Sequence, residues 1–387
     1  MTKAQEAVLK YLRAAEDEIA REQIAFTEIP SPDWKAPERA EHLIGRWRAD
    51  GLEAVKDRIG NVIAIRHGAH LRKRNRATLI LCAHIDSVFY DVREIHVKRQ
   101  GNVLRAPGIC DNAAGVATLI LVARALKRFN VETAADIIFV GSVGEEGEGR
   151  LAGMRHFFKS NSFASPFFIA IDGSGSGSIT RKALASWSPK ITVTGPGGHS
   201  YANFGRPNPV HMLARFIAKV TTLKGDKDTN TVYNATVIGG GTAVNVIPAE
   251  AHMTLNLRSS DLSRLEYLKR QARLFLKEAR REELAWATSD KTLDVRFTAL
   301  ERPGGETAEA SFIVQAAIAA LKAEGVQPMF DVKSTDANMP MSLGIPAITV
   351  ASGGKAGNAH ALDEWHDVTG RTKELAALAR MVFAIAG

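Results

Sequence analysis

The chain has 387 residues, of which 45% are apolar and 24% are charged, a composition typical of a globular protein with a sizeable core. No segment approaches the roughly 18 consecutive apolar residues that cross a bilayer, which argues against an integral membrane protein. The formal net charge of +8 would suit binding to nucleic acid or to an acidic surface. Whether the sequence favours such binding depends on where the basic residues lie.

The densest basic run is HLRKRNR at 70–76, which falls between two strand-like segments and lacks interleaved aromatic residues. A solvated hairpin loop explains it better than a nucleic-acid site. The stretch at 1–20 carries charges throughout, unlike a secretory signal, and Cys82 and Cys110 are too few for a disulfide framework. We therefore expect a cytoplasmic protein that binds neither nucleic acid nor a membrane.

The first part of the chain predicts helices followed by alternating strands and helices. Apolar residues recur at helical spacing from Val8 to Ile19, and a second amphipathic helix is expected around 40–47. Apolar runs predict strands at 60–68, 77–84, 136–143, 167–171 and 347–352. Helical stretches fall at about 112–128, 150–158, 307–324 and 371–385. This alternation predicts an α/β fold with a mixed, largely parallel sheet flanked by helices.

The middle of the chain, from about Ser188 to Leu300, has a different order of elements. Its pattern runs strand, helix, strand, strand, long helix and strand, which predicts a small α+β layer with helices on one face. The α/β pattern resumes afterwards. We therefore predict a domain at 188–300 that is inserted into a larger domain formed by residues 1–187 and 301–387.

Histidine and carboxylate side chains follow several of the predicted strands. They are His84 and Asp86 in AHIDSV, Glu145 and Glu146 in GEEGEG, Asp172 in AIDGSG and His360 in NAHALDEW, with Asp111 in GICDNAAG just before a helix. In open α/β sheets, ligands bind beyond the carboxyl ends of the strands, so these distant residues could converge there. The run GSGSGS at 173–178 directly follows one of them and is either a close-packed loop of the site or a flexible turn.

Imidazole and carboxylate groups suit divalent metals such as zinc, and two ions about 3.5–4 Å apart need a bridging carboxylate plus terminal ligands. One bridge and four terminal ligands are available in His84, Asp111, Glu146, Asp172 and His360. Asp86 is then free to orient His84, and Glu145 to take a proton from water. Singly, each has an ordinary explanation, such as a helix cap for Asp111 or a turn residue for His360. The specificity lies in the whole set.

With these motifs the chain resembles the dinuclear-zinc exopeptidases and amidohydrolases, a family that includes carboxypeptidase G, aminoacylase, succinyl-diaminopimelate desuccinylase and peptidase T. The resemblance extends over nearly the whole chain, through HID, GICDNAAG, GEEGEG, AIDG, GPGGHS, GGGTAVNVIPAE, LNLRS, STDAN and NAHALDEW. STDAN and NAHALDEW look most similar to the peptidase T-like branch.

The resemblance implies two divalent metal ions, zinc first, with cobalt or manganese as alternatives. Asp111 would bridge them, His84 and Asp172 would bind one ion, and Glu146 and His360 the other. Glu145 would be the general base and Asp86 would support His84. The peptide bond between Asp111 and Asn112 would be cis.

The resemblance also implies that the inserted segment is a lid and dimerisation domain, so that the protein forms a homodimer. His199 in GPGGHS would reach the active site of the partner subunit and stabilise the oxyanion. Asn245 and Arg258 would bind substrate, Arg258 by pairing its planar guanidinium with a carboxylate. On local sequence alone, a Gly-rich turn, a backbone-capping asparagine and a strand-end surface charge are the simpler explanations of these three residues.

These inferences predict a metal-dependent hydrolase that cleaves an amide bond of a small peptide or an N-acyl amino acid. An exopeptidase is favoured, with an N-acyl-amino-acid deacylase and a non-catalytic metal- or ligand-binding protein as alternatives. HIDSVF departs from the Thr-Val-Pro that usually follows this aspartate in the family, and GICDNAAG has Asn-Ala where many relatives carry Met-Lys or Asp-Lys. No ligand is lost, so these departures affect the substrate class more than the catalysis.

Overall fold

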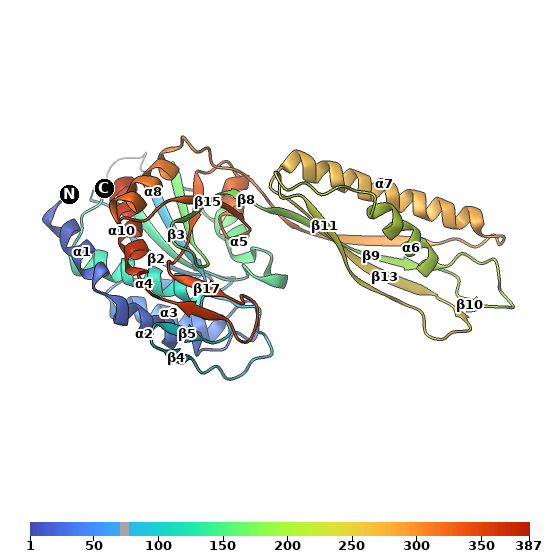
Figure 1. Cartoon of the computed structure of the whole chain (residues 1–387), viewed down its shortest axis with the longest axis horizontal. Coiled ribbons are helices and arrows are strands. Elements are labelled where there is room, and N and C mark those ends of the chain that lie inside the picture. The colour runs from blue at the N-terminus through green and yellow to red at the C-terminus, as the bar shows by residue number, and fades with distance from the viewer. Residues whose placement is uncertain (70–76) are drawn as a thin grey trace. The chain divides into compact units, whose positions relative to one another are not determined.

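The computed structural model describes residues 1–69 and 77–387, so the basic run at 70–76 lies outside the described residues (Figure 1). The chain forms two compact units, one of Met1–Ala183 with Gly305–Gly387 and one of Leu184–Gly304. The predicted boundaries at 188 and 300 each differ from these by four residues. The difference arises because the first strand of the second unit already starts at Ala185 and its last strand continues to Arg302.

The larger unit is built on an eight-stranded sheet. The strands follow the order β1 (Ala54–Lys56), β2 (Val62–Arg66), β6 (Asp136–Ser142), β3 (Thr78–His84), β7 (Pro166–Ile171), β16 (Ala347–Val350), β8 (Ser178–Ala183) and β15 (Met329–Lys333). The central strands β6, β3, β7 and β16 run parallel, whereas β2 and β8 run antiparallel to their neighbours β6 and β16. The prediction of a mixed, largely parallel sheet is confirmed.

Helices cover both faces of this sheet. They are α1 (Lys3–Arg13), α2 (Glu16–Thr27), α3 (Pro37–Ala49), α4 (Ala113–Arg128), α5 (Ala152–Ser160), α8 (Phe312–Ala323), α9 (Asn338–Ser342) and α10 (Thr372–Ala386), with a 3-10 turn at Gly147–Gly149. Leu79 and Leu81 of β3 join the core beneath α1, α3, α4, α8 and α10, while Ile80 and Cys82 join the core beneath α5 and α9. β3 is therefore buried along its whole length, as its continuous apolar run predicts.

The helix predicted from Val8 to Ile19 is two helices, which corrects that part of the prediction. α1 ends at Arg13 and α2 begins at Glu16. The acidic first turn of α2, EDE, favours a helix start there because carboxylates interact well with a helix N-terminus. Val8, Leu12 and Ile19 nevertheless enter the same core, which is why their spacing continues across the break.

Two further features position loops of the larger unit. A small antiparallel sheet, absent from the prediction, joins β17 (Lys355–Gly357), β18 (Trp365–Asp367), β5 (Val103–Arg105) and β4 (Lys98–Gln100). The run at 173–178 is close-packed: Gly173 O accepts hydrogen bonds from Ser352, and a Cβ added at Gly177 would lie 2.0 Å from the carbonyl oxygen of Gln327. Of the two interpretations of this run, the structure favours the packed loop.

The second unit is a four-stranded antiparallel sheet with its own core. The strand order is β11 (Val232–Gly240), β13 (Glu250–Ser259), β9 (Ala185–Thr194) and β14 (Asp294–Arg302), and the helices are α6 (Pro209–Val220) and α7 (Leu262–Trp286). Alternate residues of β13 are buried against these helices. A short pair, β10 (Gly198–His199) and β12 (Val246–Ile247), completes the unit. The helices lie on one side of the sheet, as predicted.

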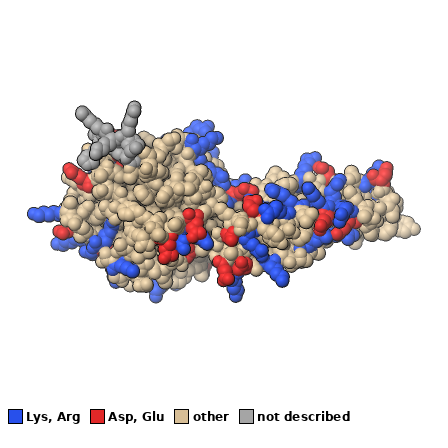
Figure 2. Space-filling model, turned by 90° about the horizontal axis from the view of Figure 1, so that it is seen from above, with Lys and Arg blue, Asp and Glu red and all other residues tan. Residues whose placement is uncertain are grey.

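Charge is mixed over the surface. Figure 2 shows Lys and Arg interspersed with Asp and Glu on the visible face of each unit. Among the helices in the described part of the chain, none has the length and apolar character needed to cross a membrane.

Candidate active site

The carboxyl ends of β3, β6 and β7 bring the predicted residues together. His84 is the last residue of β3, Glu145 and Glu146 follow β6, and Asp172 follows β7. Because these three strands are parallel neighbours, their carboxyl ends share one edge of the sheet. Two loops complete the group: Asp111 lies before α4, and His360 lies between β17 and β18. All five residues predicted as ligands thus fall into clusters with metal-ligand spacing.

Asp111 belongs to two of these clusters. Its Oδ1 lies 3.0 Å from His84 Nε2, which in turn lies 3.9 Å from Asp172 Oδ1. Its Oδ2 lies 3.2 Å from His360 Nε2, which is 3.0 Å from Glu146 Oε1. One carboxylate therefore faces two ligand groups with different oxygens, the arrangement required of a bridging ligand.

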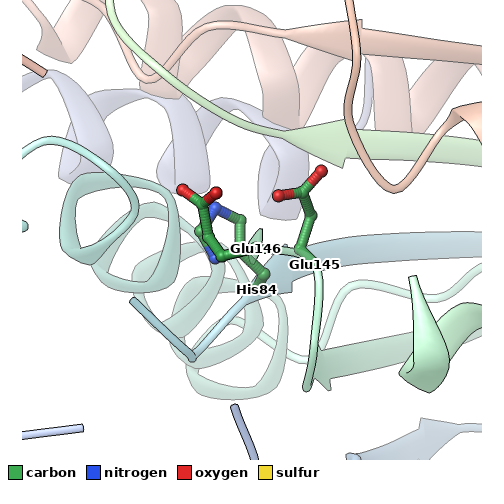
Figure 3. A group of neighbouring side chains, drawn as sticks. All are labelled: His84, Glu145 and Glu146. Atoms are coloured by element: carbon green, nitrogen blue, oxygen red, sulfur yellow. The ribbon is translucent and has the colours of Figure 1, made fainter. Parts of the chain in front are cut away.

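A third cluster joins His84 to both glutamates, with their ligand atoms within 4.8 Å of one another. Figure 3 shows the two carboxylates pointing the same way from adjacent backbone positions. Both glutamates are buried. Glu145 therefore lies next to the predicted ligands, in the same loop after β6 as Glu146.

The charges in this site perturb one another. Burial by itself lowers the pKa of the His84 imidazole, but Asp111 and Asp86 outweigh this effect and hold the pKa well above its usual range. Hydrogen bonds to Asp111 and Glu146 raise the pKa of His360 to about 10. Without a metal ion, the surrounding carboxylates therefore favour the protonated form of both imidazoles, whereas binding of an ion requires the neutral ring.

The carboxylates show the complementary effect. Burial raises the pKa of Asp172 well above its usual range, and the charge of Asp111 adds to this effect. Burial and Asp111 likewise raise the pKa of Glu146 to about 7, although His360 opposes the shift. Asp111 itself has a lowered pKa because His360 and His84 outweigh its burial. The two imidazoles thus do not fully offset the burial and the mutual repulsion of the three carboxylates.

Asp86 has a broader structural role than the predicted support of His84. Its two carboxylate oxygens accept hydrogen bonds from the backbone N–H groups of Glu145 (3.1 Å) and Glu146 (3.0 Å). His84 Nδ1 lies 3.2 Å from the backbone carbonyl of Asp86 and 3.6 Å from its Oδ1. Asp86 therefore fixes the backbone of the glutamate pair and also lies beside the imidazole.

The cap of α4 is the residue after Asp111. Asn112 Oδ1 accepts a hydrogen bond from Gly115 N at 3.2 Å, and Asn112 Nδ2 donates to Ile171 O at 2.8 Å. Asn112 therefore caps the helix in place of Asp111, and the side chain of Asp111 faces the ligand clusters. The peptide bond between Asp111 and Asn112 is cis, as the resemblance implies.

His199 and Asn245 lie together in the second unit. The backbone N–H of Ser200, the residue after His199, donates to Asn245 O at 2.9 Å, and both side chains belong to exposed residues. His199 Nδ1 accepts from the backbone N–H groups of Tyr201 (3.2 Å) and Ala202 (3.3 Å). In the neutral ring the proton is then on Nε2, which becomes the available donor.

Arg258 lies apart from this pair. It is exposed near the end of β13 that pairs with the first residues of β9, and its Nε donates to Asn256 Oδ1 at 2.9 Å. It comes eight residues after Glu250, a distance of about 27 Å along β13. The three predicted lid residues therefore form two separate groups within one chain.

Two buried carboxyl groups near the site were given no role from the sequence. Asp336 in STDAN accepts hydrogen bonds from Ser142 and, at 3.4 Å, from Cys82 Sγ, and burial together with Glu145 raises its pKa to about 7. Glu364 in NAHALDEW accepts hydrogen bonds from the backbone before α4. Both lie inside motifs quoted for the resemblance, but their partners are more than 190 residues away and no local pattern reveals them.

The fold and these clusters identify the class of protein. The model of the peptidase family M20/M25/M40 matches residues 80–386, and the chain belongs to this family of hydrolases. The resemblance noted from the motifs is thereby confirmed.

Individual relatives match shorter stretches. A protein of Pyrococcus furiosus described as a LysW-lysine/LysW-ornithine hydrolase is 31% identical over 171 residues, which are 44% of this chain and 45% of that protein. A succinyl-diaminopimelate desuccinylase of Nitrosomonas eutropha is 39% identical over 114 residues, 27% of this chain and 30% of that enzyme. The matched stretch thus spans less than half the length of these curated relatives.

Solved structures match over almost the whole chain. The aminopeptidase PepT of Bacillus cereus has a TM-score of 0.78 at 21% identity and covers 96% of this chain and 98% of its own. A dinuclear metal binding peptidase of the M20 family from Bacillus subtilis has a TM-score of 0.70 at 16% identity, with 96% and 99% covered. At identities this low, these matches establish a shared fold alone.

The clustered residues fit a pair of divalent ions. The set of histidine and carboxylate donors is the one preferred by zinc, cobalt and manganese. Asp111 Oδ1 is buried, and within residues 1–69 and 77–387 no group donates a well-aligned hydrogen bond to it, although His84 Nε2 lies 3.0 Å away. A buried carboxylate oxygen without a donor is costly unless a cation faces it.

We expect divalent ions to stabilise the protein. A cation between Asp111, Glu146 and Asp172 replaces their mutual repulsion by attraction, so a chelator should lower Tm and added Zn²⁺, Co²⁺ or Mn²⁺ should restore it. Ion present at 1,000 times its Kd would add about 4 kcal/mol to the free energy of unfolding. Thermal unfolding measures this, with KCl at matched ionic strength as the control. An unchanged Tm would contradict the assignment of a metal site.

Proposed function

We propose that this protein is a metal-dependent hydrolase that cleaves an amide bond of a small peptide or an N-acyl amino acid. The observation that carries the proposal is the division of the Asp111 carboxylate between two ligand groups, with Glu145 beside them. Two metal ions bridged by one carboxylate, with a second carboxylate beside them, are suited to hydrolysis by an activated water. An exopeptidase fits this arrangement and the likeness to PepT best.

Each residue has a proposed task. His84 and Asp172 would hold one ion, Glu146 and His360 the other, and Asp111 would lie between them. When bound, the ion pair supplies Lewis acidity toward a water and an amide carbonyl. Glu145 accepts a proton from the attacking water on its carboxylate and returns it to the leaving amine.

Two supporting residues complete the proposed mechanism. Asp86 keeps Glu145 in place through the backbone N–H of that residue. His199 donates a hydrogen bond from Nε2 to the oxyanion, a task for which its Nδ1 contacts prepare the ring.

Replacing the base tests this assignment. Glu145→Gln keeps the backbone hydrogen bond to Asp86, so metal should bind as in the wild type, while turnover falls by about 10²–10⁴-fold. Glu146→Gln makes the same chemical change one residue later and should weaken metal binding instead. Metal content and steady-state rates of both variants give the comparison. Wild-type turnover in Glu145→Gln, free of contaminating hydrolase, would refute its role as the base.

We further propose a homodimer in which His199 and Asn245 of one chain serve the active site of the other. Their adjacency supports a joint role, and their separation from Arg258 along β13 argues that the two groups serve different sites. The exposed β11, which is an edge strand of its sheet in the described part of the chain, offers a surface for such an association.

Mixing two inactive variants tests the shared site. His199→Ala and Glu145→Gln should each be nearly inactive as homodimers. When both are co-expressed, one of the two sites in each mixed dimer pairs an intact Glu145 with an intact His199, so the mixed dimers should have about half the activity of the wild type. Activity is measured on co-purified dimers carrying two different tags. Failure of the mixed dimers to regain activity would contradict a contribution from the partner subunit.

The substrate is proposed to carry a free carboxylate that pairs with Arg258. Its residue is exposed and its Nε donates to Asn256 Oδ1, while the N–H groups of its planar guanidinium are suited to bidentate pairing with a carboxylate. Arg258→Lys should therefore raise KM for free-acid peptides about tenfold, with little effect on the amidated forms. Initial rates on both forms measure this. Equal rates of the wild type on free-acid and amidated substrates would count against a carboxylate clamp.

A deacylase remains the second candidate because a desuccinylase is among the relatives. Rates on di- and tripeptides compared with N-acetyl and N-succinyl amino acids, with each metal in turn, separate the two activities. A non-catalytic protein would show neither. We also propose a cytoplasmic location, which is supported by the two free, buried cysteines Cys82 and Cys110, because free thiols are usual in reducing compartments.

A further inference from the structure

Glu364 directly precedes β18 in the loop that carries His360. Its backbone is fixed by the small sheet: Trp365 pairs with Arg105 of β5, and Glu364 O accepts a hydrogen bond from Ala106 N at 3.0 Å. Glu364 N also donates to Ala361 O at 3.1 Å. Both backbone polar groups of Glu364 are therefore hydrogen-bonded, so the position of its backbone is fixed.

The side chain of Glu364 is fully buried and is directed at the segment that leads to Asp111. Its Oε1 accepts hydrogen bonds from Cys110 N at 2.8 Å and from Asp111 N at 2.9 Å. Its Oε2 accepts from Gly108 N at 3.0 Å. Three backbone N–H groups thus converge on one carboxylate, and charge-assisted bonds of this kind are among the stronger hydrogen bonds in proteins.

The loop that contains Glu364 also needs fixed ends. Asn358 and His360 both have positive φ angles, 59° and 65°, in the left-handed region that non-glycine residues rarely adopt. Such a conformation persists only where the surroundings determine it. Glu364, four residues after His360, provides one such fixed point.

We infer that Glu364 is a positioning residue for the metal centre. Through one buried carboxylate it joins the loop of Asp111 to the loop of His360, and it thereby sets the 3.2 Å separation between Asp111 Oδ2 and His360 Nε2. This inference rests on the proposed function, because it concerns the residues proposed to bridge and bind the ions. Glu364 touches neither the substrate nor an ion and acts through the backbone.

Glu364→Gln tests the inference. The amide keeps the size of the side chain but turns an N–H donor toward a backbone N–H. Affinity for Co²⁺ and Zn²⁺ should fall about 10- to 100-fold, as is usual when a partner behind a ligand is removed. Competition with a chromophoric chelator measures the affinity, and the visible spectrum of the Co²⁺ form reports the ligand geometry. Asp363→Asn, an adjacent exposed carboxylate that accepts from Asn358, is the matched control and should bind as the wild type does.

A purely structural role gives a different result. If Glu364 only stabilised the fold, Glu364→Gln would lower the Tm of the metal-free protein and leave metal affinity and the Co²⁺ spectrum unchanged, which would overturn the inference. Glu364→Asp, which keeps the charge but withdraws it by one methylene, decides the matter if the glutamine variant does not fold. It should show the same loss of affinity. A wild-type protein that binds no ion would instead overturn the proposed function itself.

Discussion

The structure depends on confining like charges at the carboxyl edge of a parallel sheet. Asp111, Glu146 and Asp172 lie around two imidazoles, and burial disfavours the charged form of each carboxylate. Although both histidines lie beside them, the pKa values of Glu146 and Asp172 stay raised. The site therefore calls for more positive charge than its side chains carry. The proposed pair of divalent cations would meet that need and would account for a set of residues that otherwise only destabilise the fold.

The surrounding chain supplies rigidity where this repulsion would spread the residues apart. Strand pairing in register places His84 opposite Ser142, three residues before Glu145. Asp86 then fixes the next turn of chain by binding two successive backbone amides. On the other side, Asn112 ties the start of α4 to the end of β7. The last two supports are side chains bonded to a distant backbone, so the main chain holds the ligands in addition to the contacts that they make with one another.

The contrast between local and distant partners explains what could be predicted from the sequence. The continuous apolar run of β3 and the order of the ligands revealed the central strands and the site. β1, β4 and β5 escaped prediction because three residues carry no usable periodicity, and β15 because its MFDVK pattern is exposed or half-exposed throughout. The amide partners of Asp86 and Glu364 escaped prediction because nothing near a carboxylate in the sequence identifies an acceptor for backbone groups 59 or 254 residues away.

The distance between Arg258 and the pair formed by His199 and Asn245 in the second unit has consequences for the quaternary structure. Arg258 lies about 27 Å from the far end of β13, whereas a fully extended tripeptide spans only about 10 Å. A small substrate bound by Arg258 therefore cannot also reach His199 or Asn245 if the second unit of the same chain supplies all three. These residues can act on one small substrate only if two chains contribute to each site. A chain with complete metal ligands and base would then still lack its oxyanion donor, and catalysis would depend on association.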